Sequence, residues 1–129
     1  MLLQRRPGLL EQSVFFRQLS AILQSGLPLL EGLKLLQRQT SGGQLLCYRL
    51  QRTLARGKSL AEALAAEPEY FSRLSVNMAA VGEESGELAR LLEELADYYA
   101  RQDKLRRFIR QAAIYPLMLL LVSDRKSVV

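Results

Sequence analysis

The feature that most restricts the fold of this chain is a series of residues, three or four positions apart, that runs from Leu88 to Ala112. The positions in the series are Leu88, Leu91, Leu95, Tyr98, Gln102, Leu105, Ile109 and Ala112. All but Gln102 are apolar or aromatic, and this spacing follows one face of an α-helix rather than the two-residue alternation of a strand. We therefore predict one long helix from Glu87 to Val122, about 54 Å in length at 1.5 Å per residue.

Shorter segments with helical apolar stripes precede this helix, and glycine or proline residues separate them. The helices are expected at about residues 13–25, 28–40, 44–56, 59–67 and 72–84. Ser13 is predicted to cap the first of them, while Ser59 and Glu62 have the spacing of a capping box at the start of the fourth. No strand pattern competes with these helices. The sequence predicts an all-α fold, a compact six-helix bundle with a long last helix that leads toward a membrane span.

The C-terminal part of the chain changes character abruptly. Residues 112–122 form an uncharged, almost wholly apolar run of 11 residues, whereas a membrane-spanning helix needs about 20. Polar residues follow at Ser123, Asp124, Arg125 and Lys126. We interpret residues 112–122 as the start of a truncated transmembrane helix and residues 123–129 as an atypical tail.

A basic block lies immediately before the apolar run. Between Arg101 and Gln111 there are five basic residues and one acid, in a chain with 18 basic and 13 acidic residues overall. The block is typical of a nucleic-acid contact, of a solvated helix face, or of the cytoplasmic flank of a membrane span. The adjacent apolar run favours the third interpretation. A soluble basic helical bundle that binds nucleic acid remains the alternative.

The composition excludes several classes of enzyme. The chain has no histidine, which removes imidazole bases, Ser-His-Asp and Cys-His nucleophile systems, and imidazole metal sites. Its single cysteine, Cys47, excludes an internal disulfide and a thiolate zinc cluster. We predict a protein without catalytic residues or an organic cofactor.

Two carboxylates on the predicted last helix are candidates for a calcium site. Glu93 and Asp97 are four residues apart and therefore share a helix face. Carboxylate oxygens are ligands that calcium prefers, provided that other oxygens complete the shell. Such a pair is more often simply a solvated face.

The segment from Gly82 to Glu94 has two further predicted roles. Gly82 and Gly86 bracket two acids and a serine, which is typical of a tight corner between two helices. The stretch is also strongly acidic, in contrast with the rest of the chain. We predict a structural corner at Gly82 and Gly86, and a candidate surface for a basic partner at Glu87, Glu93 and Glu94. A solvated acidic face is an equally good interpretation of those three residues.

Several motifs in this order resemble the cytoplasmic domain of the type II secretion system protein F family, which also includes the inner-membrane platform proteins of type IV pili. The matching segments are Phe16-Arg17-Gln18-Leu19, Gly26-Leu27-Pro28, Gly57-Lys58-Ser59-Leu60, Gly82-Glu83-Glu84-Ser85-Gly86-Glu87-Leu88 and Tyr115-Pro116. The resemblance covers roughly residues 15–122, and its most specific part is the segment from Gly82 to Leu88.

The resemblance implies a non-enzymatic, six-helix domain on the cytoplasmic side of the bacterial inner membrane. It implies contacts with the assembly ATPase and with other inner-membrane components of a secretion or pilus machine, and no nucleic-acid partner. Some relatives bind calcium through acids of the last helix, a part that Glu93 and Asp97 would play here. A homodimer is expected from the family and from the uncovered apolar stripe of the last helix. The domain limits are then an N-terminal lead-in at 1–12, the helical bundle at 13–111, the truncated span at 112–122 and the tail at 123–129.

Overall fold

The structure, a computed structural model, describes residues 7–39 and 42–128, and the side chains up to Val122. It contains six helices, which are α1 (Leu9–Gln24), α2 (Leu29–Gln39), α3 (Gln44–Ala55), α4 (Leu60–Ala65), α5 (Arg73–Ser85) and α6 (Leu88–Val128). No strand occurs in the described ranges. The prediction of an all-α bundle with a long last helix is confirmed.

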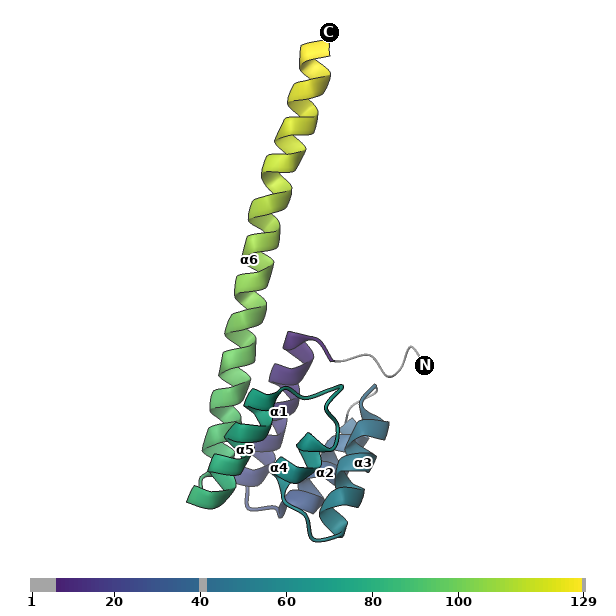
Figure 1. Cartoon of the computed structure of the whole chain (residues 1–129), viewed down its shortest axis with the longest axis vertical. Coiled ribbons are helices and arrows are strands. Elements are labelled where there is room, and N and C mark those ends of the chain that lie inside the picture. The colour runs from purple at the N-terminus through teal and green to yellow at the C-terminus, as the bar shows by residue number, and fades with distance from the viewer. Residues whose placement is uncertain (1–6, 40–41, 129) are drawn as a thin grey trace.

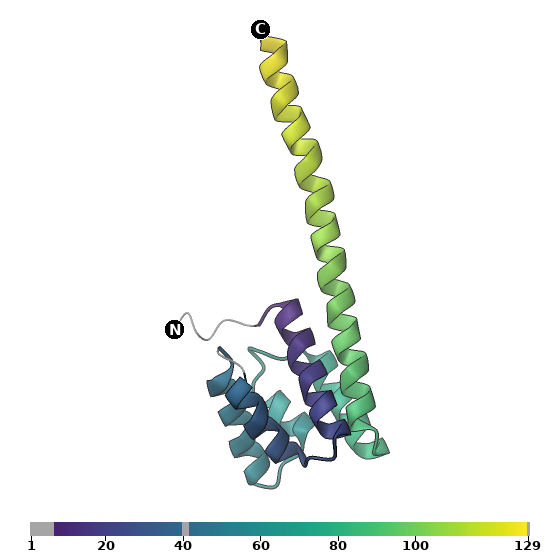
Figure 2. The same ribbon diagram turned by 180° about the vertical axis from the view of Figure 1, so that it is seen from behind.

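The first five helices form a bundle on one side of the N-terminal part of α6, and the rest of α6 projects from the bundle as a single rod (Figure 1). Seen from behind, α1 lies along α6, while α2 and α3 form a pair on the side of the bundle away from α6 (Figure 2). Ser13 of α1 contacts Ala96 of α6 and Ser20 contacts Ala89, so the two helices are antiparallel. The bundle therefore ends where α1 begins, and α6 continues beyond it.

The core is made mainly of leucine and aromatic side chains from five of the helices and from the loop before α5, and α5 adds the small side chain of Ala79. Its largest fully buried apolar side chains are Phe16, Leu19, Leu33, Leu36, Leu50, Leu60, Leu64, Leu92 and Leu95. The ring of Phe16 stacks on that of Tyr99 with centroids 6.1 Å apart, and Phe71 lies 5.8 Å from Phe16. Tyr70 and Phe71 come from the loop between α4 and α5, and both are buried.

The predicted cap of the first helix at Ser13 is wrong. Helix α1 begins at Leu9, with Gly8 at the N-cap position, so residues 9–12 of the predicted lead-in are helical. Leu9 packs against the core, which gives the extra turn a reason to form. The Ser13 side chain is buried and donates a hydrogen bond to the Ala96 carbonyl oxygen at 2.8 Å. Ser20, two turns later, donates to the Ala89 carbonyl oxygen at 2.6 Å, so both hydroxyls join α1 to α6.

The predicted seam of α6 is right in part. Leu91 and Leu95 are buried as expected, but Tyr98 is 37% exposed and its neighbour Tyr99 is buried instead. Leu92 and Ala96 are also buried, because α6 packs against α1 on one side and α5 on the other. Because α6 contacts two helices at once, its apolar stripe must be wider than a single seam with a 3.5-residue period. Beyond the bundle no other described helix covers the series, and Leu105 and Ile109 are more than half exposed.

Candidate interaction surface

The corner between α5 and α6 depends on close approach at one glycine and on an unusual backbone conformation at the other. A Cβ added to Gly82 would lie 2.9 Å from the Cα of Leu88, which is closer than real side chains tolerate. Gly86 follows the end of α5 with φ of 74°, in the left-handed region that favours glycine. The Glu87 amide then donates a hydrogen bond to the Gly82 carbonyl oxygen at 2.9 Å. The chain turns here within two residues, which brings α6 directly against α5.

Glu83, between these glycines, has a structural role that the sequence did not predict. Its carboxylate accepts hydrogen bonds from the backbone amides of Leu60 at 2.7 Å and Ala61 at 3.0 Å. These amides belong to the first turn of α4, where no intrahelical acceptor is available. Ser59 and Glu62 form the predicted capping box at the same end. Because Glu83 lies more than twenty positions after the start of α4 in the sequence, no local pattern predicts this second cap.

The acids of the candidate partner surface are exposed but engaged by neighbouring side chains. The Arg90 guanidinium donates to Glu87 at 3.0 Å and to Glu94 at 2.9 Å, and both carboxylates are about half exposed. The hydrogen bond from Arg90 lowers the pKa of Glu87, and the same contact raises the pKa of Arg90. Glu93 accepts a hydrogen bond from the Gln24 side-chain amide at 3.1 Å. A basic partner would therefore compete with Arg90 for two of the three carboxylates.

The two calcium candidates both face α1. Asp97 forms an ion pair with Arg17 at 2.8 Å, and Glu93 contacts Gln24 as described. Across the described residues, no three histidine, cysteine, aspartate or glutamate side chains gather closely enough to hold a metal ion. A calcium ion at Asp97 would have to displace Arg17 and find further oxygen ligands. The site stays a prediction from the sequence.

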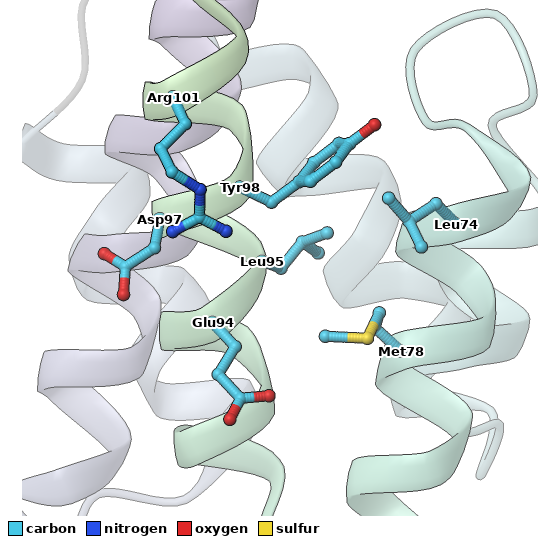
Figure 3. A pocket seen from close by; sticks show the side chains of 7 residues that line it. All are labelled: Leu74, Met78, Glu94, Leu95, Asp97, Tyr98 and Arg101. Carbon is cyan, nitrogen blue, oxygen red and sulfur yellow. The ribbon is translucent and has the colours of Figure 1, made fainter.

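A shallow groove of about 430 Å³ lies between α5 and α6, and Asp97 is one of the residues that line it. Figure 3 shows Leu74 and Met78 of α5 opposite Leu95 and Tyr98 of α6, and Glu94, Asp97 and Arg101 along the α6 side. We call this the α5–α6 groove. Tyr98 and Leu74 are each more than one-third exposed, so the apolar part of the groove is open to a partner. Leu95 and Tyr98 belong to the apolar series predicted for the last helix, but its spacing does not indicate that part of this face stays uncovered.

Comparison with known proteins decides the family. A family model described as type II secretion system (T2SS), protein F, matches residues 15–123 of the chain. The chain belongs to the type II secretion system protein F family. The resemblance carried by the sequence motifs is therefore confirmed.

Individual relatives in this family come from both secretion and pilus systems. The chain is 40% identical over 109 residues to the type 4 fimbrial assembly protein PilC of Pseudomonas putida, which covers 83% of this chain and 27% of that protein. It is 37% identical over 118 residues to the type IV pilus assembly protein PilC of Thermus thermophilus, covering 90% of this chain and 29% of that protein. It is 35% identical over 124 residues to the type II secretion system protein F of Aeromonas hydrophila, covering 95% of this chain and 32% of that protein. The chain thus spans about three-tenths of the length of these relatives.

The last part of the projecting rod of α6 exposes a continuous run of apolar side chains. From Ile114 to Val122, every large side chain is at least 48% exposed. No helix within the described ranges combines the length and the apolar character needed to cross a bilayer.

Proposed function

We propose that this chain is the cytoplasmic domain of an inner-membrane platform protein that organises a type II secretion or type IV pilus assembly machine. The single observation that carries the proposal is the family match over residues 15–123. The architecture supports it, because a compact bundle is joined to a rod whose basic block is followed by an apolar run. The bundle would then lie on the cytoplasmic side of the bacterial inner membrane, with its basic block next to the bilayer.

The proposed role is binding rather than catalysis. The hydroxyl groups of Ser13 and Ser20 are committed to backbone carbonyls, and the carboxylates of Glu83, Glu87 and Asp97 to amides or arginines. Groups held in this way stabilise a surface and are poorly suited to proton transfer. Energy for moving pilin or pseudopilin subunits would come from the assembly ATPase.

The candidate contact for that ATPase is the acidic surface of α6, formed by Glu87, Glu93 and Glu94. The three side chains are exposed at the N-terminal end of α6, far from the projecting rod. A partner that approaches from the cytoplasm would meet this end of the bundle first. Exposed acids of this kind steer a basic partner and set its orientation.

The test is co-purification of the chain with its cognate ATPase. The variant Glu87→Lys, Glu93→Lys, Glu94→Lys should lose most of the bound ATPase while keeping the helical circular dichroism and thermal melt of a folded bundle. The matched control is Glu11→Lys, Glu31→Lys, Glu69→Lys, which changes the net charge equally at exposed acids elsewhere. Equal retention by both variants would remove this surface, and failure of the unmodified chain to bind any component of the machine would contradict the proposed function.

We also propose a homodimer that uses the α5–α6 groove. Leu74 and Tyr98 give the groove an exposed apolar part beside the half-buried Met78, and an exposed aromatic side chain in such a patch is typical of self-association surfaces. The groove lies on the bundle itself, so association would not depend on the apolar rod.

A further inference from the structure

Helix α6 leaves the bundle near Lys104. Leu10, in the first turn of α1, lines an open depression together with α6 residues that begin at Ala100 and extend to Gln111. From Lys104 to Val122, every residue of α6 is exposed. No other described helix buries this part of α6, so most of its surface is open to a partner of matching chemistry.

The exposed rod has two successive zones of different chemistry. The first, residues 104–110, is the basic zone and contains Lys104, Arg106, Arg107 and Arg110. The second, residues 112–122, is the apolar zone and has no charged or amide side chain. Eleven consecutive residues make three helical turns, so apolar side chains point in every direction around the axis. A protein groove covers one face of a helix, whereas the acyl chains of a bilayer cover all of them.

The basic zone contains a pair of arginines that has no acidic partner within the described chain. Arg106 and Arg110 are four residues apart, on one face of α6, and neither forms an ion pair with a described residue. Arg107, in contrast, is paired with Asp103. Two like charges at this spacing destabilise a helix, and here they lie in its middle, away from the C-terminal dipole that favours cations. A bound anion would remove the repulsion.

The two zones have the spacing of a membrane interface. Arg110 lies about 3 Å and Arg106 about 9 Å from Ala112 along the axis, at 1.5 Å per residue. Each headgroup layer is roughly 5–7 Å deep, from a bilayer of about 40–45 Å with a hydrocarbon core of about 30 Å. Flexible arginine side chains in these positions reach the phosphate level when the apolar zone lies among the acyl chains.

We propose that Arg106 and Arg110 bind the phosphate groups of anionic phospholipids, so that α6 holds the bundle at a negatively charged membrane surface. Guanidinium groups bind phosphate oxygens in a bidentate manner, and neighbouring arginines increase the affinity for anionic lipid. Nucleic acid offers the same phosphates, but it leaves the adjoining apolar zone in water. The inference rests on the membrane placement in the proposed function and adds a lipid preference with named residues.

The experiment is co-sedimentation of the full chain with vesicles of two compositions, phosphatidylcholine alone and phosphatidylcholine with about 30% phosphatidylglycerol. The apolar zone should give binding to both. The arginine pair should make binding to the anionic vesicles at least tenfold tighter, since each basic residue near such a surface contributes a several-fold factor. The variant Arg106→Gln, Arg110→Gln should lose this preference and keep its binding to neutral vesicles.

A matched control exists in α3. Arg52 and Arg56 are also four residues apart and exposed, but they lie at the C-terminal end of α3, where a helix dipole stabilises cations. The variant Arg52→Gln, Arg56→Gln should keep the anionic preference in full.

Three results would overturn the proposal. They are an unchanged lipid preference in the Arg106→Gln, Arg110→Gln variant, an equal loss in the α3 control, or a gel shift of DNA that depends on the arginine pair while the vesicles show no preference. Any of them would leave co-purification with the ATPase unaffected, so this failure is distinguishable from failure of the proposed function.

Discussion

The carboxylate of Glu83, on α5, accepts a hydrogen bond of 2.7 Å from the backbone amide of Leu60, at the start of α4. A second bond from Ala61 makes the contact bidentate. Helix α4 has only six residues and depends on such contacts, because a helix this short is not stable by itself. The motif around Gly82 thus serves two junctions, the corner with α6 and the cap of α4.

The first prediction separates the two glutamates of this motif. Glu83→Gln replaces one acceptor oxygen with an amide that faces a backbone donor, and should lower the free energy of unfolding by about 1–2 kcal/mol. Glu84 is exposed, and Glu84→Gln should change it by less than about 0.5 kcal/mol. Urea denaturation of both variants is the measurement. Equal stabilities would show that the contact of Glu83 with the start of α4 contributes nothing.

The second prediction separates the two glycines of the corner. Gly82→Ala places a Cβ against the backbone of Leu88 and should destabilise the fold by about 2–4 kcal/mol, because α6 must move. A Cβ at Gly86 meets nothing within 4 Å, so Gly86→Ala should cost only about 1 kcal/mol, from its positive φ. Gly86→Asn should be milder still, since asparagine tolerates this conformation. Thermal melts that rank Gly86→Ala as the more damaging change would contradict the close approach at Gly82.

These two junctions also show what a sequence can reveal about such a fold. The helices and the box of Ser59 and Glu62 follow from local spacing, and they were predicted. The roles of Ser13 and Glu83 depend on partners 83 and 23 positions away, which local spacing does not reveal. The choice of Tyr99 over Tyr98 for the core depends on two helices packing against α6 at once. The α5–α6 groove could not be predicted, because an apolar stripe does not show whether a neighbour covers it.

The third prediction concerns the stability of the fold at low pH. The hydrogen bond from the Ser59 amide lowers the pKa of Glu62, and that from Arg90 lowers the pKa of Glu87, both from an ordinary value of 4.5. A carboxyl with a lowered pKa in the folded state stabilises the fold above its unfolded pKa, and this contribution is lost as the pH falls through the folded value. The chain should therefore lose stability below about pH 4.5. The Glu62→Gln variant should be less stable than the unmodified chain at neutral pH, and it should lose less stability on acidification. If the difference in unfolding free energy between the two proteins stays the same at all pH values, the effect is excluded.

The fourth prediction tests the proposed dimer. Tyr98→Ser with Leu74→Ser removes the exposed apolar part of the α5–α6 groove and should weaken self-association by at least tenfold, because central aromatic residues dominate such contacts. Tyr48→Ser with Leu45→Ser is the control, since both side chains are about half exposed on α3. Sedimentation velocity over a range of concentrations gives the comparison. A strict monomer at high concentration, or equal weakening by the control, would remove the groove as the dimer contact.

The most direct test of the central claim is site-specific photo-crosslinking in cells that carry the cognate machine. A photoreactive residue in place of Glu94, at the proposed contact surface, should capture the assembly ATPase, identified by mass spectrometry. The same residue in place of Glu69, an exposed acid in the loop between α4 and α5, should not. Capture of the ATPase at position 94 alone is the result that the account predicts. Absence of a crosslink to any component of a secretion or pilus machine, from a chain that is folded and expressed, would contradict it.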